Sequence, residues 1–213
     1  MPTLHGFGAD ALTLSAITNR LPELLSTLDD SSNPDEAVIF FQPNFGHKGM
    51  PKKVTDAGRV DFGHFDAIVG TAKAVYLIDS LTEKSPEVRN TLVEYDRIRQ
   101  YPHIIFRGYR DAWQEQKPAN WLSFEEQQAD SLRAKFPRNK VAPFGSEIAS
   151  VLEFVLMSLQ NCGNELVDVA LYHRREDATQ YPHEMIPNRF RLTTLFYKAI
   201  NASCIVSLAK SES

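Results

Sequence analysis

The chain has 213 residues, of which 43% are hydrophobic and 10% aromatic, so it is long and apolar enough to build a full core. Its formal net charge of −4 argues against a protein that coats nucleic acid without specificity. No apolar run approaches the ~18 residues that a membrane span needs, and no basic segment followed by a hydrophobic one marks a secretory signal.

The N-terminal part of the chain predicts a helix followed by a strand. Leucine and isoleucine side chains recur at helical intervals between about residues 10 and 30, which gives this segment one apolar face. Pro22 lies inside the pattern, so we expect it to kink or split the helix. The turn-forming sequence "DDSSNPDE" ends the helix, and the β-branched and aromatic run from Ala37 to Phe41 predicts a buried strand.

The next segment predicts a loop and then a β-hairpin. Glycine and proline interrupt the sequence "GHKGMPKKVTDAGR", which therefore reads as a loop. Two strands are expected after it, roughly at His64–Val69 and Ala74–Ser80, joined by the sequence "GTAK".

The second half of the chain predicts helices and further strands. Helical spacing covers about residues 86–113, within which Pro102 indicates either two helices or a kink. The sequence "WLSFEEQQADSLRAKF" predicts a helix with Ser123 and Glu126 as a capping box, and "SEIASVLEFVLMSLQ" predicts a helix capped by Ser146. Strands are expected in "LVDVALYHRR", "FRLTTLFYKAI" and "CIVSLAK", the last two as edge or extension strands.

This order of elements predicts the fold class. A helix, a strand, a strand pair, helices and further strands are typical of an α/β fold, or of an α+β fold, with a mixed central β-sheet flanked by helices. We expect a single domain over residues 1–213, with its N-terminal helix at about 10–30. Its core would cover about 36–175 and the additional strands about 189–210.

Two carboxylates, Asp66 and Asp79, lie inside the apolar runs of the predicted hairpin, where an unpaired carboxylate is costly to bury. We take Val69 to face Ala74 at the closing pair of the hairpin. Asp66 then faces Leu77 and lies diagonal to Asp79 on the same sheet face, within roughly 7–8 Å at the backbone. A shared Mg²⁺ or Mn²⁺ ion would offset the cost of burial, and a solvated or salt-bridged pair at the strand ends is the alternative.

The sequence "FDAIVGTAKAVYLIDSL" resembles the hairpin of the PD-(D/E)XK nuclease superfamily. In that pattern an acid on one strand is followed on the next strand by acid–x–Lys, and Asp66 and Asp79 match the two acids. The flanking sequences "VIFFQPNFG" and "YDRIRQYPHIIFRGYRDAW" add to the resemblance, which covers residues 36–121. It implies a restriction-endonuclease-like core and a phosphodiester hydrolase in which the two acids hold Mg²⁺ or Mn²⁺.

Leu81 breaks the resembled pattern. It stands where the family has a lysine that orients the attacking water and stabilises charge on the scissile phosphate. Lys84 is the nearest replacement, whereas Lys73 lies in the turn at the other end of the hairpin. The resemblance therefore implies either a nuclease in which Lys84 is catalytic or a catalytically inactive nuclease-fold protein. The inactive form would bind nucleic acid or a protein partner.

Basic side chains near the hairpin are candidates for binding the phosphates of DNA or RNA. Four of them lie in the loop before the acidic strand, and one lies on the helix after the hairpin: Lys48, Lys52, Lys53, Arg59 and Arg99. The alternatives are a solvated loop and surface charges on an amphipathic helix.

A second resemblance leads to a different class of enzyme. The sequence "HIIFRGYRD" is similar to the strand that begins the NAD site of ADP-ribosyltransferases, with Arg107 in the binding role. That family also has a Ser-x-Ser-type strand and a late catalytic glutamate, and neither is found downstream in a strand context.

Cysteine use and charge bear on compartment and partners. Cys162 and Cys204 are far apart and lack the spacing of a metal site, which fits a reducing, cytoplasmic compartment. We expect no membrane partner. A homodimer is compatible with the sequence, but no residue pattern marks an interface.

Overall fold

The computed structural model describes residues 5–46, 60–82, 92–137, 139–176, 190–197 and 205–207. The chain forms two compact units, one of Met1–Phe41, Asp66–Tyr95 and Cys162–Ser213, the other of Gln42–Phe65 and Asp96–Asn161. The fold class is α/β with a mixed five-stranded central sheet, which confirms the prediction from element order. The single-domain boundaries stay a prediction.

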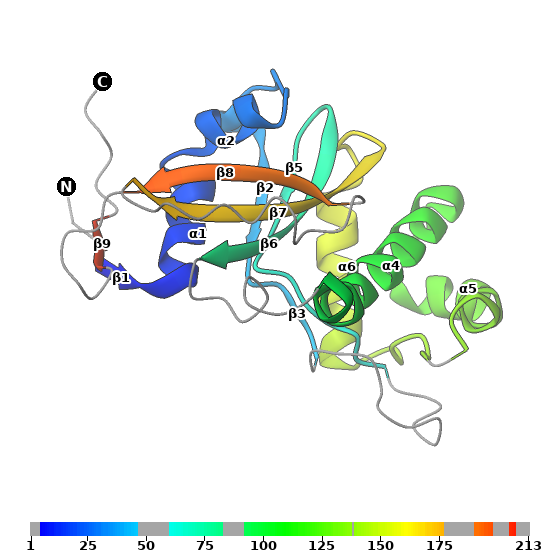
Figure 1. Ribbon diagram of the computed structural model, residues 1–213. Helices are drawn as coiled ribbons and strands as arrows, with labels where there is room; N and C mark the ends of the chain where they lie inside the picture. The colour runs from blue at the N-terminus through cyan, green and yellow to red at the C-terminus, as the bar shows by residue number, and fades with distance from the viewer. Residues whose placement is uncertain are drawn as a thin grey trace. The chain divides into compact units, whose positions relative to one another are not determined.

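The five-stranded sheet belongs to the first unit (Figure 1). Its strands lie in the order β2 (Val38–Phe41), β5 (Ala67–Gly70), β6 (Ala74–Thr82), β7 (Glu165–Arg175) and β8 (Arg191–Tyr197). The neighbours β2, β5 and β6 run antiparallel, whereas β6, β7 and β8 are parallel. A separate antiparallel pair consists of β1 (His5–Phe7) and β9 (Ile205–Ser207). β6 is the central strand of the sheet, with β5 on one side and β7 on the other. Its residues from Ala74 to Leu81 are all buried.

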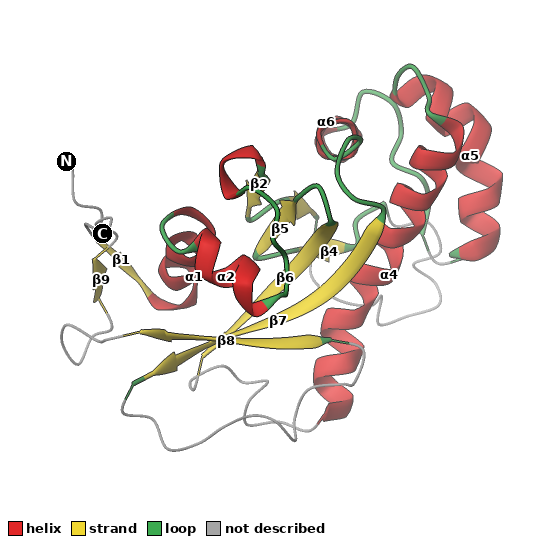
Figure 2. Ribbon diagram, turned by 90° about the horizontal axis from the view of Figure 1, so that it is seen from above, coloured by secondary structure: helices red, strands yellow, loops and turns green. Residues whose placement is uncertain are grey.

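Two helices cover one face of this sheet (Figure 2). They are α1 (Gly8–Thr18) and α2 (Leu21–Thr27), with Pro22 in the first turn of α2. Of the predicted kink or split at Pro22, the structure shows the split, because proline is well tolerated in the first turn of a helix. The buried cluster between helices and sheet includes Ile17, Leu24, Leu28, Val69, Tyr76, Ile78, Val169, Leu171 and Leu195.

The chain before the hairpin differs from the prediction in two places. The strand β2 is half-exposed, with Ile39 36% and Phe41 38% exposed, because it is an edge strand with one neighbour. The expected strand at His64–Val69 is two strands, β4 (Gly63–His64) and β5, with Asp66 between them. The reason is that β4 pairs with β3 (Asn44–Phe45) while β5 pairs with β2 and β6.

The second unit consists of β3, β4 and three helices around an aromatic core. The helices are α4 (Leu92–Gln116, whose first residues belong to the other unit), α5 (Trp121–Lys135) and α6 (Glu147–Ser158). Pro102 lies inside the single helix α4, so of the two alternatives predicted there, two separate helices or a kink, the first is wrong. Phe45 stacks on Phe62 at 5.0 Å between ring centroids, and Trp113 lies 5.1 Å from Phe124. No helix among the described residues is long and apolar enough to span a membrane.

Of the two N-caps predicted for helices of the second unit, one is correct and one is wrong. Ser146 caps α6 as predicted, because its side chain accepts a hydrogen bond from the Ala149 amide at 3.2 Å. The capping box at Ser123 and Glu126 is wrong. Asn120 is the N-cap of α5, and its side chain accepts a hydrogen bond from the Ser123 amide at 3.0 Å. The predicted helix begins at the correct residue, Trp121, but its predicted cap is three residues too late.

A buried carboxylate anchors the β5–β6 hairpin to the chain that follows α2. Asp30 Oδ2 accepts hydrogen bonds from the Thr71 hydroxyl at 2.7 Å and the Tyr76 hydroxyl at 2.8 Å, and Oδ1 accepts one from the Ser32 amide. Burial alone would raise the pKa of Asp30, but these hydrogen bonds outweigh it and hold the pKa below its usual value. Burial and the Asp30 carboxylate both raise the pKa of Tyr76, which therefore stays a hydrogen-bond donor.

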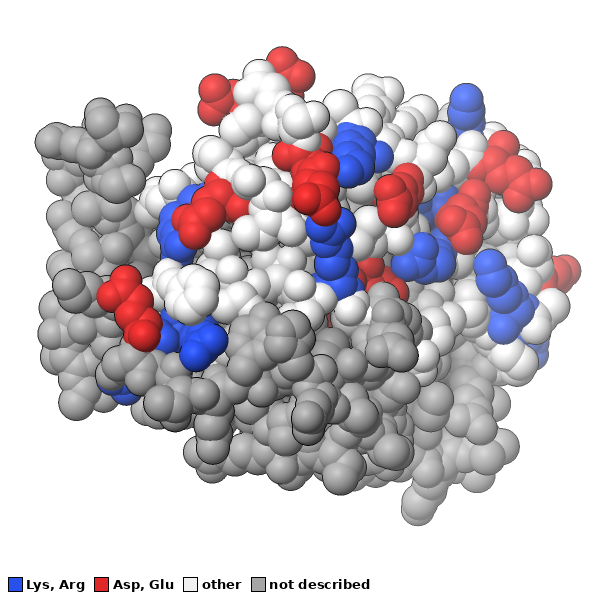
Figure 3. Space-filling view, turned by 45° about the horizontal axis from the view of Figure 1, so that its top comes forward, with Lys and Arg blue, Asp and Glu red and all other residues white. Residues whose placement is uncertain are grey.

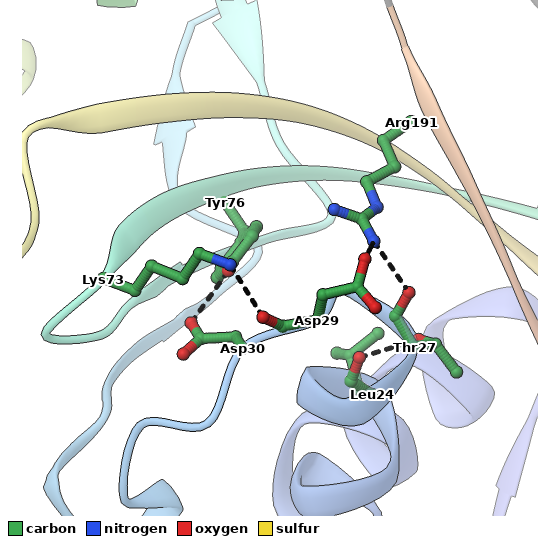
Figure 4. A network of polar contacts seen from close by, with 7 residues as sticks. All are labelled: Leu24, Thr27, Asp29, Asp30, Lys73, Tyr76 and Arg191. Atoms are coloured by element: carbon green, nitrogen blue, oxygen red, sulfur yellow. Dashed lines mark hydrogen bonds and ion pairs between the residues drawn. The ribbon is translucent and has the colours of Figure 1, made fainter.

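Surface contacts extend this anchor (Figure 4). Lys73, in the hairpin turn, donates from Nζ to the Asp29 carbonyl at 2.7 Å. Arg191, at the start of β8, donates to the Asp29 carboxylate and to the Thr27 carbonyl. The chain at the end of α2 is therefore connected to the hairpin turn through Lys73 and to β8 through Arg191, beside the buried Asp30.

Gly163 holds the other side of the same turn. Its amide donates to the Thr71 carbonyl at 2.8 Å, and a Cβ atom added to it would lie 1.9 Å from the Lys73 carbonyl oxygen. Because that neighbour is backbone, it has little freedom to move away. The close approach of two backbones explains a glycine two residues before β7.

We expect Gly163→Ala to lower the free energy of unfolding by about 1–3 kcal/mol, the usual cost of forcing extra atoms into a packed site. Urea unfolding at pH 7 measures the effect, with Gln160→Ala at an exposed position as the control. Equal stability of the two variants would contradict the backbone contact between Gly163 and the turn.

We expect Asp30→Asn to lower the free energy of unfolding by about 1–3 kcal/mol at pH 7, because it removes the charge from a buried acceptor of three hydrogen bonds. The folded-state pKa of Asp30 is lowered, so its contribution is present above the usual value of 3.8 and is lost as the pH falls through the folded pKa. Urea unfolding from pH 7 down to pH 2–3 should therefore show the two proteins converging in acid. The exposed Asp35→Asn is the control, and a difference independent of pH would contradict the assignment.

Candidate active site

Asp66 and Asp79 lie at the end of the β5–β6 hairpin away from its turn, in a different register from the predicted one. The register pairs Ala67 with Ile78 and Gly70 with Val75. The Thr71 amide also donates to the Ala74 carbonyl, so the turn has two residues and not four. The predicted pairing of Asp66 with Leu77 is therefore wrong, and continuing the register places Asp66 opposite Asp79.

The Asp66 carboxylate replaces a backbone partner that β6 loses. In a continued register the Ser80 amide would face the carbonyl of residue 65, but Phe65 turns away and donates its amide to the Pro43 carbonyl. Asp66 Oδ2 accepts the Ser80 amide instead, at 2.7 Å, and the Asp66 amide donates to the Ile78 carbonyl at 3.1 Å. The carboxylate thus touches the peptide bond that joins Asp79 to Ser80.

Asp79 lies at the centre of the sheet. Its neighbours Ile78 and Ser80 contact residues on the helix-covered face, so the alternation of side chains places Asp79 on the opposite face. Its side chain is 1% exposed, and that of Asp66 is 9% exposed. Two carboxylates so deeply buried need partners or an ion, since burial without either is costly.

Leu81, at the position where the resembled pattern has a lysine, is a core residue. It shares the Asp79 face and packs in a buried cluster with Ala170, Tyr172 and Phe190. At 1% exposure it fills apolar space and offers neither charge nor a hydrogen bond. Any cation for this site has to come from another position.

His173, on β7, does not supply that cation. It lies on the helix-covered face, where its Nε2 is 3.5 Å from the Thr13 hydroxyl. Burial, with a smaller effect of the Arg20 charge, lowers the pKa of His173 to about 3. The imidazole is therefore neutral at physiological pH and lies on the wrong side of the sheet.

The remaining predicted site residues fall into three groups. Lys48, Lys52, Lys53, Arg59 and Lys84 lie outside the described residues. Arg99 lies in α4, and its side chain is also outside what the structure describes. Lys73 is in the hairpin turn at the far end of β6 from Asp79, where it binds the Asp29 carbonyl.

Arg107 does not support the ADP-ribosyltransferase reading. That resemblance needs a strand at "HIIFRGYRD", whereas these residues lie inside α4, a helix of 25 residues. The expected NAD-site strand is therefore wrong.

The donor set of the acid pair suits a hard divalent cation. Mg²⁺ keeps several waters and takes one or two protein carboxylates, and carboxylate oxygens also suit Mn²⁺. Among the described residues no group of three or more His, Cys, Asp or Glu side chains is placed to hold an ion. A metal here would therefore depend on Asp66 and Asp79 as its protein ligands.

The described surface carries both signs of charge. In Figure 3 the blue Lys and Arg side chains are interspersed with red Asp and Glu side chains on the face shown. Among the described residues visible there, neither sign forms a continuous patch. This view therefore locates no nucleic-acid surface among them.

Ser80 and Thr13 support the acid pair, and neither is among the site residues predicted from the sequence. A polar residue directly after Asp79, inside an apolar strand, is a local signal that would have singled out Ser80. Thr13 hydrogen bonds to Ser80 from 67 positions away, so no local pattern reveals it.

Comparison of the chain with protein-family models, with curated proteins and with solved structures finds no match.

We expect Asp66→Ala to lower the free energy of unfolding by about 1–3 kcal/mol, because it leaves the buried Ser80 amide without its acceptor. Asp66→Asn keeps an oxygen in place and should retain most of that stability. Urea unfolding compares the two with the exposed Asp35→Ala, which should change stability by less than about 0.5 kcal/mol. If Asp66→Ala is as stable as Asp66→Asn, the Ser80 hydrogen bond is not what holds this end of the hairpin.

Proposed function

We propose that the chain is a metal-dependent phosphodiester hydrolase of the PD-(D/E)XK type. The observation that supports it is the hydrogen bond from the Ser80 amide to the carboxylate of Asp66, directly before β5, in a register that when continued places Asp66 opposite Asp79 on β6. The resembled family pattern asks for two acids in this relation. The buried position of both side chains fits a role that needs them in a water-poor, ordered environment.

Each residue has a stated task in this proposal. Asp66 and Asp79 hold Mg²⁺ or Mn²⁺, and the Ser80 amide orients the Asp66 carboxylate. The bound ion would supply charge stabilisation for the phosphate and a more acidic water. Lys84 takes the place of the missing lysine, and the basic residues of the 47–59 loop and Arg99 bind the DNA or RNA backbone.

A second candidate rests on Leu81. Because its side chain fills an apolar cluster beside Asp79, the lysine position has become part of the core. This favours a catalytically inactive nuclease-fold protein that binds nucleic acid or a protein partner. The two candidates differ in whether Lys84 supplies the charge that Leu81 cannot.

A cleavage assay separates the candidates. The full chain is incubated with plasmid DNA, single-stranded DNA and RNA, in Mg²⁺, in Mn²⁺ and in EDTA. We expect cleavage that requires the metal and falls by roughly two orders of magnitude or more in Asp66→Asn, Asp79→Asn and Lys84→Met. Lys73→Met, at the far end of the hairpin, is the matched control and should cleave at the wild-type rate.

Three other outcomes are informative. Cleavage that survives both aspartate substitutions contradicts the proposed site. Mn²⁺ binding by calorimetry without cleavage of any substrate favours the inactive binding protein. Metal-dependent cleavage that is unchanged in Lys84→Met keeps the hydrolase and removes Lys84 from it.

A further inference from the structure

Three polar side chains meet on the helix-covered face of the sheet, within the first unit. Thr13 Oγ1, on α1, lies 2.6 Å from Ser80 Oγ on β6 and 3.5 Å from His173 Nε2 on β7. It also lies 2.8 Å from the Ala9 carbonyl oxygen in the preceding turn of α1. All three side chains are buried, at 0% exposure for Thr13, 4% for Ser80 and 2% for His173.

Thr13 is the centre of this cluster, because its hydroxyl takes part in all three contacts. Its hydroxyl has one proton, and the Ala9 carbonyl can only accept. Both short contacts of Thr13 can exist together only if the Ser80 hydroxyl supplies the proton for its own bond. The Ser80 side chain is thereby held in one orientation.

Ser80 connects the two faces of the sheet. Its hydroxyl is held by Thr13 on the helix side, and its amide donates to Asp66 Oδ2 at the end of the hairpin. The peptide bond that carries this amide is also the one that leaves Asp79. A chain of contacts therefore runs from α1 through Ser80 to the Asp66 carboxylate and to the backbone of Asp79.

We propose that Thr13 is a positioning residue for the acid pair, acting through Ser80; this inference rests on the proposed function of that pair as a metal site. By fixing Ser80 it fixes the amide that orients Asp66 and the backbone that carries Asp79. Groups that orient a metal ligand without touching the ion commonly change its affinity 10–100-fold when they are removed. Thr13 reaches the Asp66 carboxylate only through Ser80, one hydrogen bond further from the ion than the groups in that comparison. We therefore expect an effect at the lower end of the range.

The variants at Thr13 separate positioning from packing. Thr13→Val keeps the shape and removes the hydroxyl, whereas Thr13→Ser keeps the hydroxyl and removes a methyl group. Ile17→Val removes a methyl group from the buried face of the same helix and controls for a modest loss of stability. Thr18→Val controls for loss of a threonine bond to the helix backbone, because Thr18 donates to the Leu14 carbonyl at 2.6 Å and is exposed.

Calorimetric titration of the full chain with Mn²⁺ is the first measurement. We expect Thr13→Val to bind Mn²⁺ about 10-fold more weakly than wild type, with Thr13→Ser, Ile17→Val and Thr18→Val close to wild type. Wild-type affinity in Thr13→Val overturns the inference, and so does an equal loss in Ile17→Val. Failure of the wild type itself to bind Mn²⁺ is a different result, which removes the proposed function and this inference with it.

Hydrogen exchange at the Ser80 amide is the second measurement, and it needs no metal. Thr13→Val should speed the exchange of a peptide containing Ser80 several-fold more than Ile17→Val does, while Thr13→Ser restores slow exchange. Unchanged exchange in Thr13→Val shows that the hydroxyl does not hold Ser80, and it overturns the inference independently of the metal result.

Discussion

The buried Asp30 carboxylate accepts hydrogen bonds from Thr71 and Tyr76, one at the turn and one on the second strand of the β5–β6 hairpin. Together with the Gly163 amide on the Thr71 carbonyl, these bonds hold the turn at two residues. Side chains alternate along a strand, so a slip of one residue would exchange the two faces of β6. Tyr76 and Ile78 would then leave the helix-covered core, and Asp79 would enter it. The architecture of the first unit therefore depends on this register.

The same register produces the acid pair. With a two-residue turn, β5 begins directly after Asp66. The continued register places Asp66 opposite Asp79 and beside the Ser80 amide. The Asp66 carboxylate then has a structural task, as a substitute for a missing backbone acceptor, before any metal is considered. A structural role and the proposed metal role use the same group, which is why the substitutions at Asp66 have to be read for stability and for binding separately.

The strand β6 is buried and yet contains two consecutive polar residues. Its burial by neighbours on both sides favours an unbroken apolar strand, yet it carries Asp79 and Ser80 in its second half. Ser80 is satisfied on the helix side by Thr13, and Leu81 returns the strand to apolar packing. The polar residues are therefore confined to one step of the strand. Leu81 fits this core, so under the proposed function a positive charge would have to come from elsewhere in the chain.

Local signals in the sequence were sufficient for most elements. Apolar spacing located α1, α2 and α6, proline located the break between α1 and α2, and β-branched runs located β6 and β7. These features depend on residues within one or two turns of each other, which is why they can be read in order along the chain. The wrong cap of α5 shows the limit even there, since Asn120 and Ser123 are both acceptable caps and only the backbone decides between them.

The sequence by itself determined a mixed sheet flanked by helices, in an α/β or α+β fold, together with the presence of a hairpin and the two acids that it carries. Only the tertiary structure decided the register of that hairpin, the half-exposed edge position of β2 and the separation of β4 from β5. It also joined Thr13 to Ser80, and Asp30 to Tyr76. Each of these depends on contacts between residues far apart in the chain, whose energy is set by which groups become buried together and not by the local preference of either segment.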